Sequence, residues 1–154
     1  MNPDELRRLV QLIVKQAREL KDAHTLERNA PVNYACVFSQ SDVEYSELLA
    51  IASQLGKIIQ NTTMGPIFQI TPLDTVAGKL QLLKIRKPDK MRPELGDADF
   101  TLSNYSEFKK TSLNLPGFRL IQRENYEMIE LIDSKFNAIA YFSHPTLDKQ
   151  LGLA

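Results

Sequence analysis

The sequence has few of the residues from which metal sites, disulfides and nucleophilic active sites are usually built. It contains one cysteine, two histidines and no tryptophan among its 154 residues. A single cysteine cannot form an internal disulfide, which is typical of a protein in a reducing compartment. Cys36 lies in the apolar segment 34–38, and no cationic residue adjoins it. We therefore interpret it as a small buried side chain and not as a reactive thiol.

The sequence also lacks an excess of charge and any long apolar run. Lys and Arg number 19, and so do Asp and Glu, so the formal net charge is zero. Such a chain has no long-range field to attract nucleic acid or an anionic membrane, and we expect neither as a partner. No apolar run approaches the length that crosses a bilayer, and residues 2–5 lead into an amphipathic helix and not into a signal sequence. We expect a soluble, cytoplasmic protein.

Short catalytic and metal-binding motifs are missing. There is no Gly-rich phosphate loop, no Gly-x-Ser-x-Gly, no Cys-x-x-Cys and no His-Glu-x-x-His. His24 and His144 have no partner at ligand or catalytic spacing. The sequence thus predicts neither a metal nor a cofactor and favours a function other than catalysis, although an enzyme without these motifs stays open.

The N-terminal segment 1–29 predicts a long helix. Asn2 can cap it, Pro3 suits its first position, and apolar residues then recur at helical spacing from Leu6 to Leu20. Pro31 lies beyond its expected end. This apolar stripe could pack on the protein's own sheet or form a subunit contact. We favour the first interpretation, and expect a homodimer through some surface.

The rest of the chain predicts the same series of elements twice. A strand at 32–39 precedes a helix that begins with the capping-box spacing of Ser41 and Glu44 and ends at Gly56. Strands are expected at 57–61, 66–71 and 79–86. After an exposed, charged connection at 87–96, the alternating segment 97–103 predicts a half-buried strand, a helix follows from Asn104 to Gly117, and three strands follow at 118–123, 126–132 and 138–142.

We therefore predict one α+β domain, residues 1–154. Its parts are the N-terminal helix 1–29, a first βαβββ unit at 32–86, the connection 87–96, a second βαβββ unit at 97–144 and a tail at 145–154. The strands are expected to form a curved, mostly antiparallel sheet.

Two tandem βαβββ units resemble the vicinal-oxygen-chelate superfamily, which includes glyoxalase and dioxygenase-like proteins. The resemblance implies that each unit forms half of a cupped sheet and that the cup holds the ligand. It also implies ligands for a divalent metal, usually His, Gln or Glu near the start of each unit's first strand and Glu on its last strand. This sequence departs from that pattern, because the last strands contain no Glu. The available residues are Asn33, Asp97 and Asp99 on the first strands, and Lys79, Gln81, Lys84, Arg86, Asn137, Tyr141, Ser143 and His144 on the last strands.

Charged residues on otherwise apolar strand faces indicate where a ligand could bind. Glu130 shares a strand face with Tyr126, Met128 and Ile132, which is a costly place for an unpaired carboxylate unless it faces a polar cavity. If the strands curl into a cup, polar residues of several strands meet in one cleft. We predict the ligand-binding residues to be Asp99, Thr101, Arg123, Glu130 and Tyr141. A solvated sheet face with cross-strand ion pairs is the alternative.

The polarised segment from Lys84 to Asp99 has two interpretations of its own. It could be an anion-binding loop, in which several donors converge on a phosphate or carboxylate, or a solvated linker whose opposite charges compensate. We favour the linker.

The leading functional hypothesis is a small-molecule-binding or regulatory domain without a catalytic metal. One alternative is a metal-independent lyase or isomerase in which Glu130 or Asp99 is the general base and Tyr141 or an arginine stabilises the developing anion. Another is a scaffold protein that acts through the N-terminal helix or the charged connection.

Overall fold

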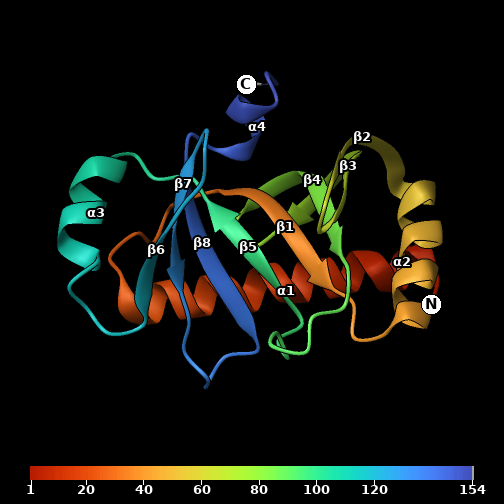
Figure 1. The fold of residues 1–154 in the computed structure, drawn as a ribbon, viewed down its shortest axis with the longest axis horizontal. Coiled ribbons are helices and arrows are strands. Elements are labelled where there is room, and N and C mark those ends of the chain that lie inside the picture. Colours follow the sequence, from red (N-terminus) through yellow and green to blue (C-terminus); the bar gives the residue numbers. More distant parts are fainter. Residues whose placement is uncertain (154) are drawn as a thin grey trace.

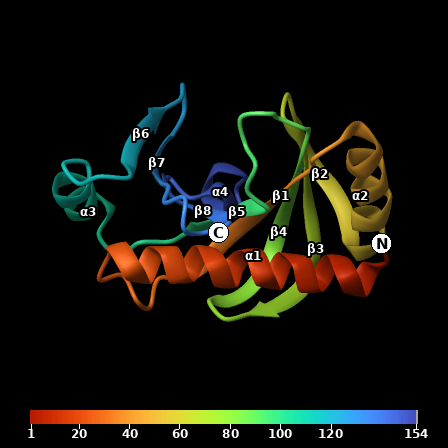
Figure 2. The same ribbon diagram turned by 90° about the horizontal axis from the view of Figure 1, so that it is seen from below.

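A long helix crosses the base of a single sheet in the computed structural model, which describes residues 1–153. Helix α1 (Pro3–His24) begins where the Asn2 side chain accepts a hydrogen bond of 2.8 Å from the backbone N–H of Glu5. The helix runs beneath the sheet (Figure 2), and its apolar stripe is fully buried. The buried residues of the stripe are Leu6, Val10, Ile13, Val14, Ala17 and Leu20. The helix therefore packs on its own sheet, as we favoured.

The first unit has the predicted order of elements. It comprises β1 (Val32–Phe38), α2 (Asp42–Leu55), β2 (Gly56–Thr62), β3 (Gly65–Thr75) and β4 (Gly78–Arg86). The Ser41 side chain caps α2 by accepting from the N–H of Glu44 at 3.1 Å. Strand β3 is longer than predicted, because it continues past Thr71 through a register shift against β4.

The second unit repeats that order with shorter elements. It comprises β5 (Gly96–Phe100), α3 (Tyr105–Ser112), β6 (Phe118–Gln122), β7 (Glu127–Leu131) and β8 (Ala138–His144). A short helix, α4 (Leu147–Gln150), lies in the expected tail. The prediction of a half-buried strand over 97–103 was wrong in two respects. The strand ends at Phe100, and every residue of β5 is buried, because it lies at the centre of the sheet between β1 and β8.

The eight strands form one open sheet in the order β2-β3-β4-β1-β5-β8-β7-β6. Strands β1 and β5 join the two units at its centre as an antiparallel pair. Within each unit the first and last strands pair parallel, and the remaining neighbours pair antiparallel. Helices α2 and α3 lie at opposite ends of the molecule (Figure 1). The predicted α+β class, with two βαβββ units and a mostly antiparallel sheet, is confirmed.

The central joint requires a glycine. A Cβ atom at position 96 would lie 2.1 Å from the carbonyl oxygen of Cys36 and 2.9 Å from Cδ1 of Ile13. Strand β5 thus approaches both β1 and α1 closely. This contact fixes the two units against each other.

The sheet has two unlike faces. The face toward α1 belongs to the main hydrophobic core, with Ala35, Leu83, Ala98 and Phe142 among its buried residues. The opposite face has only a small apolar cluster. No helix within residues 1–153 combines the length and apolar character needed to cross a bilayer.

Candidate functional site

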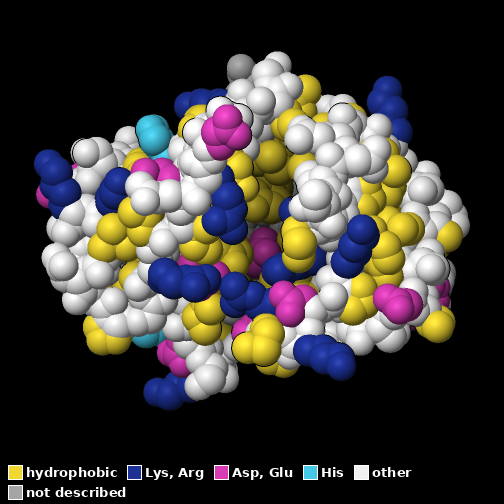
Figure 3. All heavy atoms as spheres, viewed as in Figure 1, with side chains coloured by type: hydrophobic (Ala, Val, Ile, Leu, Met, Phe, Trp, Pro, Cys, Tyr) yellow, Lys and Arg dark blue, Asp and Glu magenta, His cyan; other side chains and the backbone are white. Residues whose placement is uncertain are grey.

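A cleft opens on the sheet face that points away from α1. Its volume is about 670 Å³, within the range of small-molecule sites. Figure 3 shows the hollow at the centre of the molecule, with basic side chains around it. It is lined by residues of both units, namely Tyr34, Cys36, Thr62, Thr63, Met64, Lys84, Arg86, Arg92, Asp97, Arg119, Leu120, Ile121, Gln122, Arg123, Tyr126, Met128 and Tyr141.

Strand register aligns the polar residues of this face in two rows. In the first row, Lys84 on β4 lies opposite Cys36 on β1, which lies opposite Asp97 on β5. In the second row five neighbouring strands contribute one residue each. These residues are Tyr34, Asp99, Tyr141, Glu130 and Arg119. The sheet therefore brings together groups that lie up to 107 positions apart in the chain.

Five cationic side chains line the cleft, whereas Asp97 is the single carboxylate among its lining residues. Arg86 pairs with Asp89 at 3.1 Å, and its guanidinium lies 5.2 Å from the centroid of the Phe38 ring. Lys84 and Arg123 form no ion pair with any residue in the described range 1–153. The cleft thus has cationic donors free to meet an anion.

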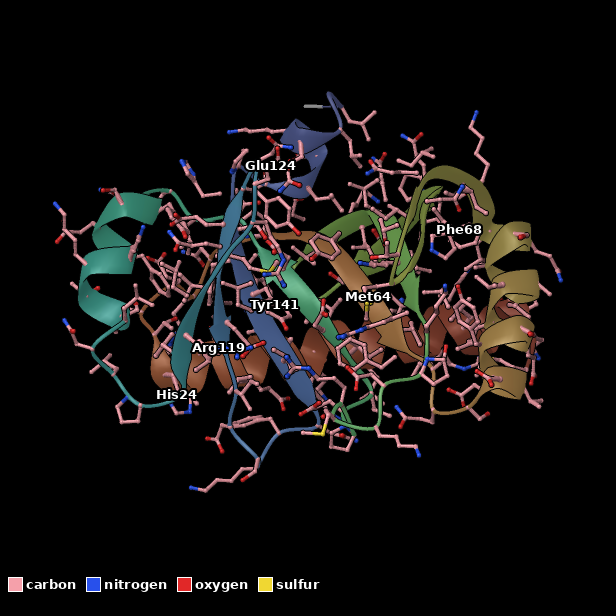
Figure 4. All side chains as sticks on the ribbon, viewed as in Figure 1. His24, Met64, Phe68, Arg119, Glu124 and Tyr141 are labelled. Carbon is pink, nitrogen blue, oxygen red and sulfur yellow. The ribbon has the colours of Figure 1, made fainter. Side chains whose placement is uncertain are left out.

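Glu130 contacts three side chains that line the cleft. It is 3% exposed, and its Oε2 accepts from the Tyr141 hydroxyl at 2.7 Å and from Arg92 at 3.1 Å. Its Oε1 lies 3.2 Å from Nη2 of Arg119. Both oxygens are occupied by protein donors. Glu130 therefore positions two arginines and a tyrosine that line the cleft. Figure 4 labels two of them, Arg119 and Tyr141.

Asp97, unlike Glu130, is a buried carboxyl with an oxygen that no protein donor meets in the described residues 1–153. It is 5% exposed, and its Oδ1 has no hydrogen-bond partner within residues 1–153. The pKa of its carboxyl is raised to about 8, chiefly by burial and also by the nearby Asp99, while Lys84, Arg86 and Arg92 offset part of these effects. Near neutral pH this carboxyl is largely protonated and can donate a hydrogen bond.

Asp99 lies on the same sheet face but is satisfied within the protein. Its Oδ1 accepts from the N–H of Ser143 at 3.3 Å, and its Oδ2 accepts from the Ser143 hydroxyl. Burial raises the pKa of Asp99 to about 7, while these hydrogen bonds act in the opposite direction. Burial is also the largest cause that raises the pKa of Tyr141.

The structure places the five predicted ligand-binding residues differently. Arg123 and Tyr141 line the cleft. Glu130 and Asp99 are not among the residues that line it, and both accept hydrogen bonds from protein donors. Thr101 lies apart, because β5 ends before it and it lines a separate depression with residues 26–31.

Sequence reasoning passed over Asp97, Lys84, Arg86 and Arg92 as site residues. The cluster of basic residues was visible, but we favoured a solvated linker for it. In the structure Lys84 and Arg86 belong to β4, and Arg92 reaches from the connection into the cleft. The signal for Asp97 was its alternation with Ala98 and Phe100. That pattern indicated a polar face without showing that the face is buried.

The central strands do not offer the donors of a divalent metal. Within residues 1–153 no three His, Cys, Asp or Glu side chains are grouped so as to hold a metal ion. Where the superfamily resemblance implies ligands on the last strand of the first unit, β4 carries Lys84 and Arg86, whose charge repels a cation. The residues present do not fit the implied metal.

Comparisons with known proteins establish the fold and nothing beyond it. No protein-family model matches the chain, and no curated protein matches it. The chain is similar to a solved structure described as "Structural Genomics, Protein EC4020", with a TM-score of 0.69 and 11% identity over 97% of this chain and 88% of that one. At this identity the likeness concerns the arrangement of the elements.

Proposed function

We propose that the protein is a small-molecule-binding domain and that its ligand is an organic anion held in the central cleft. The observation that carries this proposal is the convergence of five cationic side chains, from both units and the connection, on one cavity. A cavity walled by protein concentrates the field of such groups. The zero net charge of the chain makes this local excess a property of the cleft and not of the whole surface.

The remaining lining residues indicate the rest of the ligand. Met64, Tyr126 and Met128 add apolar and aromatic surface. Figure 4 shows Met64 and Arg119 on opposite sides of Tyr141, and all three side chains line the cleft. Such walls suit a molecule with an anionic group on an apolar or aromatic body.

The resemblance to the vicinal-oxygen-chelate superfamily supports a ligand in the cup. We propose a member or relative of that group in which the cationic residues of β4 take the place of a metal. A bound anion then receives from Lys84 and Arg86 the positive charge that a metal would otherwise supply.

Both rival functions have less support from the geometry. A lyase or isomerase with Glu130 or Asp99 as base would need a carboxylate oxygen turned toward the substrate, whereas both side chains accept hydrogen bonds within the protein. A scaffold role for the N-terminal helix would need a free apolar stripe, whereas the stripe is buried under the sheet.

The fluorescent probe 8-anilinonaphthalene-1-sulfonate tests the proposal, because it combines a permanent anion with an aromatic body. Its uncharged analogue, N-phenyl-1-naphthylamine, is the matched control ligand. We expect the anionic probe to bind the native protein with a single saturable site and the uncharged one to bind at least about tenfold more weakly, since the difference of a buried charge contact is of order 1.4 kcal/mol or more.

Two substitutions locate the site. Lys84→Gln removes a cation from the cleft, and Lys87→Gln removes one from an exposed position just beyond β4. Both variants carry the same net charge. We expect only Lys84→Gln to weaken the anionic probe, by about fivefold to twentyfold. Equal weakening by both, or none by either, would contradict the anion-binding cleft.

A further inference from the structure

We propose that Asp97 donates a hydrogen bond from its neutral carboxyl to the oxyanion of the bound ligand, so that the cleft binds an organic oxyanion while Asp97 holds its proton. This inference rests on the proposed anion-binding function and adds the residue that selects the ligand's acceptor group. The ligand class is organic acids whose ionised group reaches the floor of the cleft beside Asp97.

Three features of Asp97 lead to this assignment. Its side chain lines the cleft, it is 5% exposed, and its Oδ1 lacks a partner among residues 1–153. Buried carboxyl oxygens are rarely left unpaired, so a ligand atom is the natural partner. No Lys or Arg nitrogen of the described chain lies within 4.0 Å of Asp97, so no direct ion pair holds it ionised.

The neighbours of Asp97 favour its neutral form and supply the charge that an anion needs. Asp99, two residues along β5, is a second buried carboxyl on the same face. Burial raises the pKa of Asp97 to about 8. Lys84 faces it across Cys36 in the first row of the sheet. An oxyanion in this position would meet a cation on one side and an O–H donor on the other.

Other groups that face Asp97 are distinguishable from it. They are Tyr34 and Cys36 on β1, Lys84 and Arg86 on β4, Arg92 on the connection, Asp99 on β5 and Tyr141 on β8. Burial raises the pKa of Tyr34, Cys36 and Tyr141, so these three stay neutral in the acid and neutral range. Arginine keeps its charge throughout. Asp99 is the remaining carboxyl; it does not line the cleft, and Ser143 donates hydrogen bonds to both of its oxygens.

Calorimetric titration of the anionic probe 8-anilinonaphthalene-1-sulfonate tests the inference. Sulfonate stays ionised at every pH used, so any proton taken up on binding belongs to the protein. Titrations in buffers of different ionisation enthalpy give the number of protons. Near pH 6 we expect no proton to be taken up on binding, and near pH 9 we expect close to one proton per probe molecule bound. The dissociation constant of the probe should rise about tenfold per pH unit above about pH 8.

The variant Asp97→Asn replaces the neutral carboxyl by a neutral amide that still donates a hydrogen bond. We expect it to bind the probe near pH 6 within about threefold of the natural protein, and to take up no proton near pH 9. Proton uptake that persists in this variant, or a natural protein that takes up none, would overturn the inference.

A second measurement does not depend on the variant's fold. In protein labelled with ¹³C at aspartate carboxyl groups, the Asp97 resonance should titrate near pH 8 and should move to higher pH when the probe is added. If the probe binds the cleft but the Asp97 resonance neither titrates near pH 8 nor shifts its titration on binding, the inference fails and the anion-binding function stands. If Lys84→Gln leaves probe binding unchanged, the proposed function itself fails.

Discussion

Replacing Asp97 by Asn should make the protein more stable, and by an amount that depends on pH. The carboxyl of Asp97 is buried, and its pKa is raised from 3.8 to about 8. The native state therefore holds a proton that the unfolded chain releases above about pH 4. Over the window from about pH 4 to about pH 8, stability falls as the pH rises, because the unfolded state binds fewer protons than the native state.

The magnitude follows from that window. Each pH unit within it lowers the free energy of unfolding by up to about 1.36 kcal/mol, so the whole window costs on the order of 5 kcal/mol. Asn at position 97 keeps the shape of the side chain and has no proton to lose. We expect the free energy of unfolding of Asp97→Asn to be higher than that of the natural protein by about 2–5 kcal/mol near pH 9 and by about 2 kcal/mol or less near pH 5.

Urea denaturation followed by far-UV circular dichroism at both pH values measures the difference. Asp74→Asn on β3 is the matched control, because the side chain of Asp74 is 82% exposed, and we expect its effect to stay within about 0.5 kcal/mol at either pH. Parallel pH profiles for the natural protein and Asp97→Asn would refute the reasoning, as would a variant that is less stable near pH 9.

Three further substitutions test the framework around the cleft, each by urea denaturation. Glu130→Gln should lower the free energy of unfolding by about 2–4 kcal/mol, because it leaves the partly buried Arg92 without its carboxylate. Gly96→Ala should cost about 3 kcal/mol or more, because the added methyl meets the carbonyl oxygen of Cys36 at the joint of the two units. Ile13→Ala should cost about 2–5 kcal/mol through a cavity between α1 and the sheet.

Each of these three substitutions has a control, in which a residue of the same or a similar type is changed at a more exposed or less crowded position. Glu124→Gln in the exposed β6–β7 turn should change stability by less than about 0.5 kcal/mol. Gly78→Ala meets no atom within 4 Å and should cost about 1–2 kcal/mol from its φ of 104° alone. Leu12→Ala, at 41% exposure, should cost about 1 kcal/mol or less. If a control substitution lowered the free energy of unfolding as much as its test substitution, the packing described for the test position would be contradicted.

The sequence predicted the elements well, because their signals are local. The cap at Asn2, the capping box at Ser41 and the stripe of α1 are read within a few residues, and the structure has each of them. The repeated order of elements also constrained the sheet, since two similar units must pair through corresponding strands. What the local patterns could not supply was the depth of burial of β5.

The site was only partly predictable for the same reason. Arg123 and Tyr141 were recognised because they stand out on strands, yet the row that joins Asp97 to Lys84 depends on the pairing of β1 with both β4 and β5. These pairings connect residues far apart in the chain. The partners of Glu130 illustrate the point, because Arg92 lies 38 positions away in a segment without regular structure.

Asp97 is also where stability and the proposed function oppose each other. A carboxyl at this position weakens the fold above about pH 4, and an amide of the same shape would not. A group that costs stability and leaves one oxygen unpaired calls for a role that the amide cannot fill. Asn would serve as well as Asp if the hydrogen bond alone mattered. The carboxyl differs in that it can release the proton, so it allows the cleft to hold an anion when protonated and to repel the same anion when ionised.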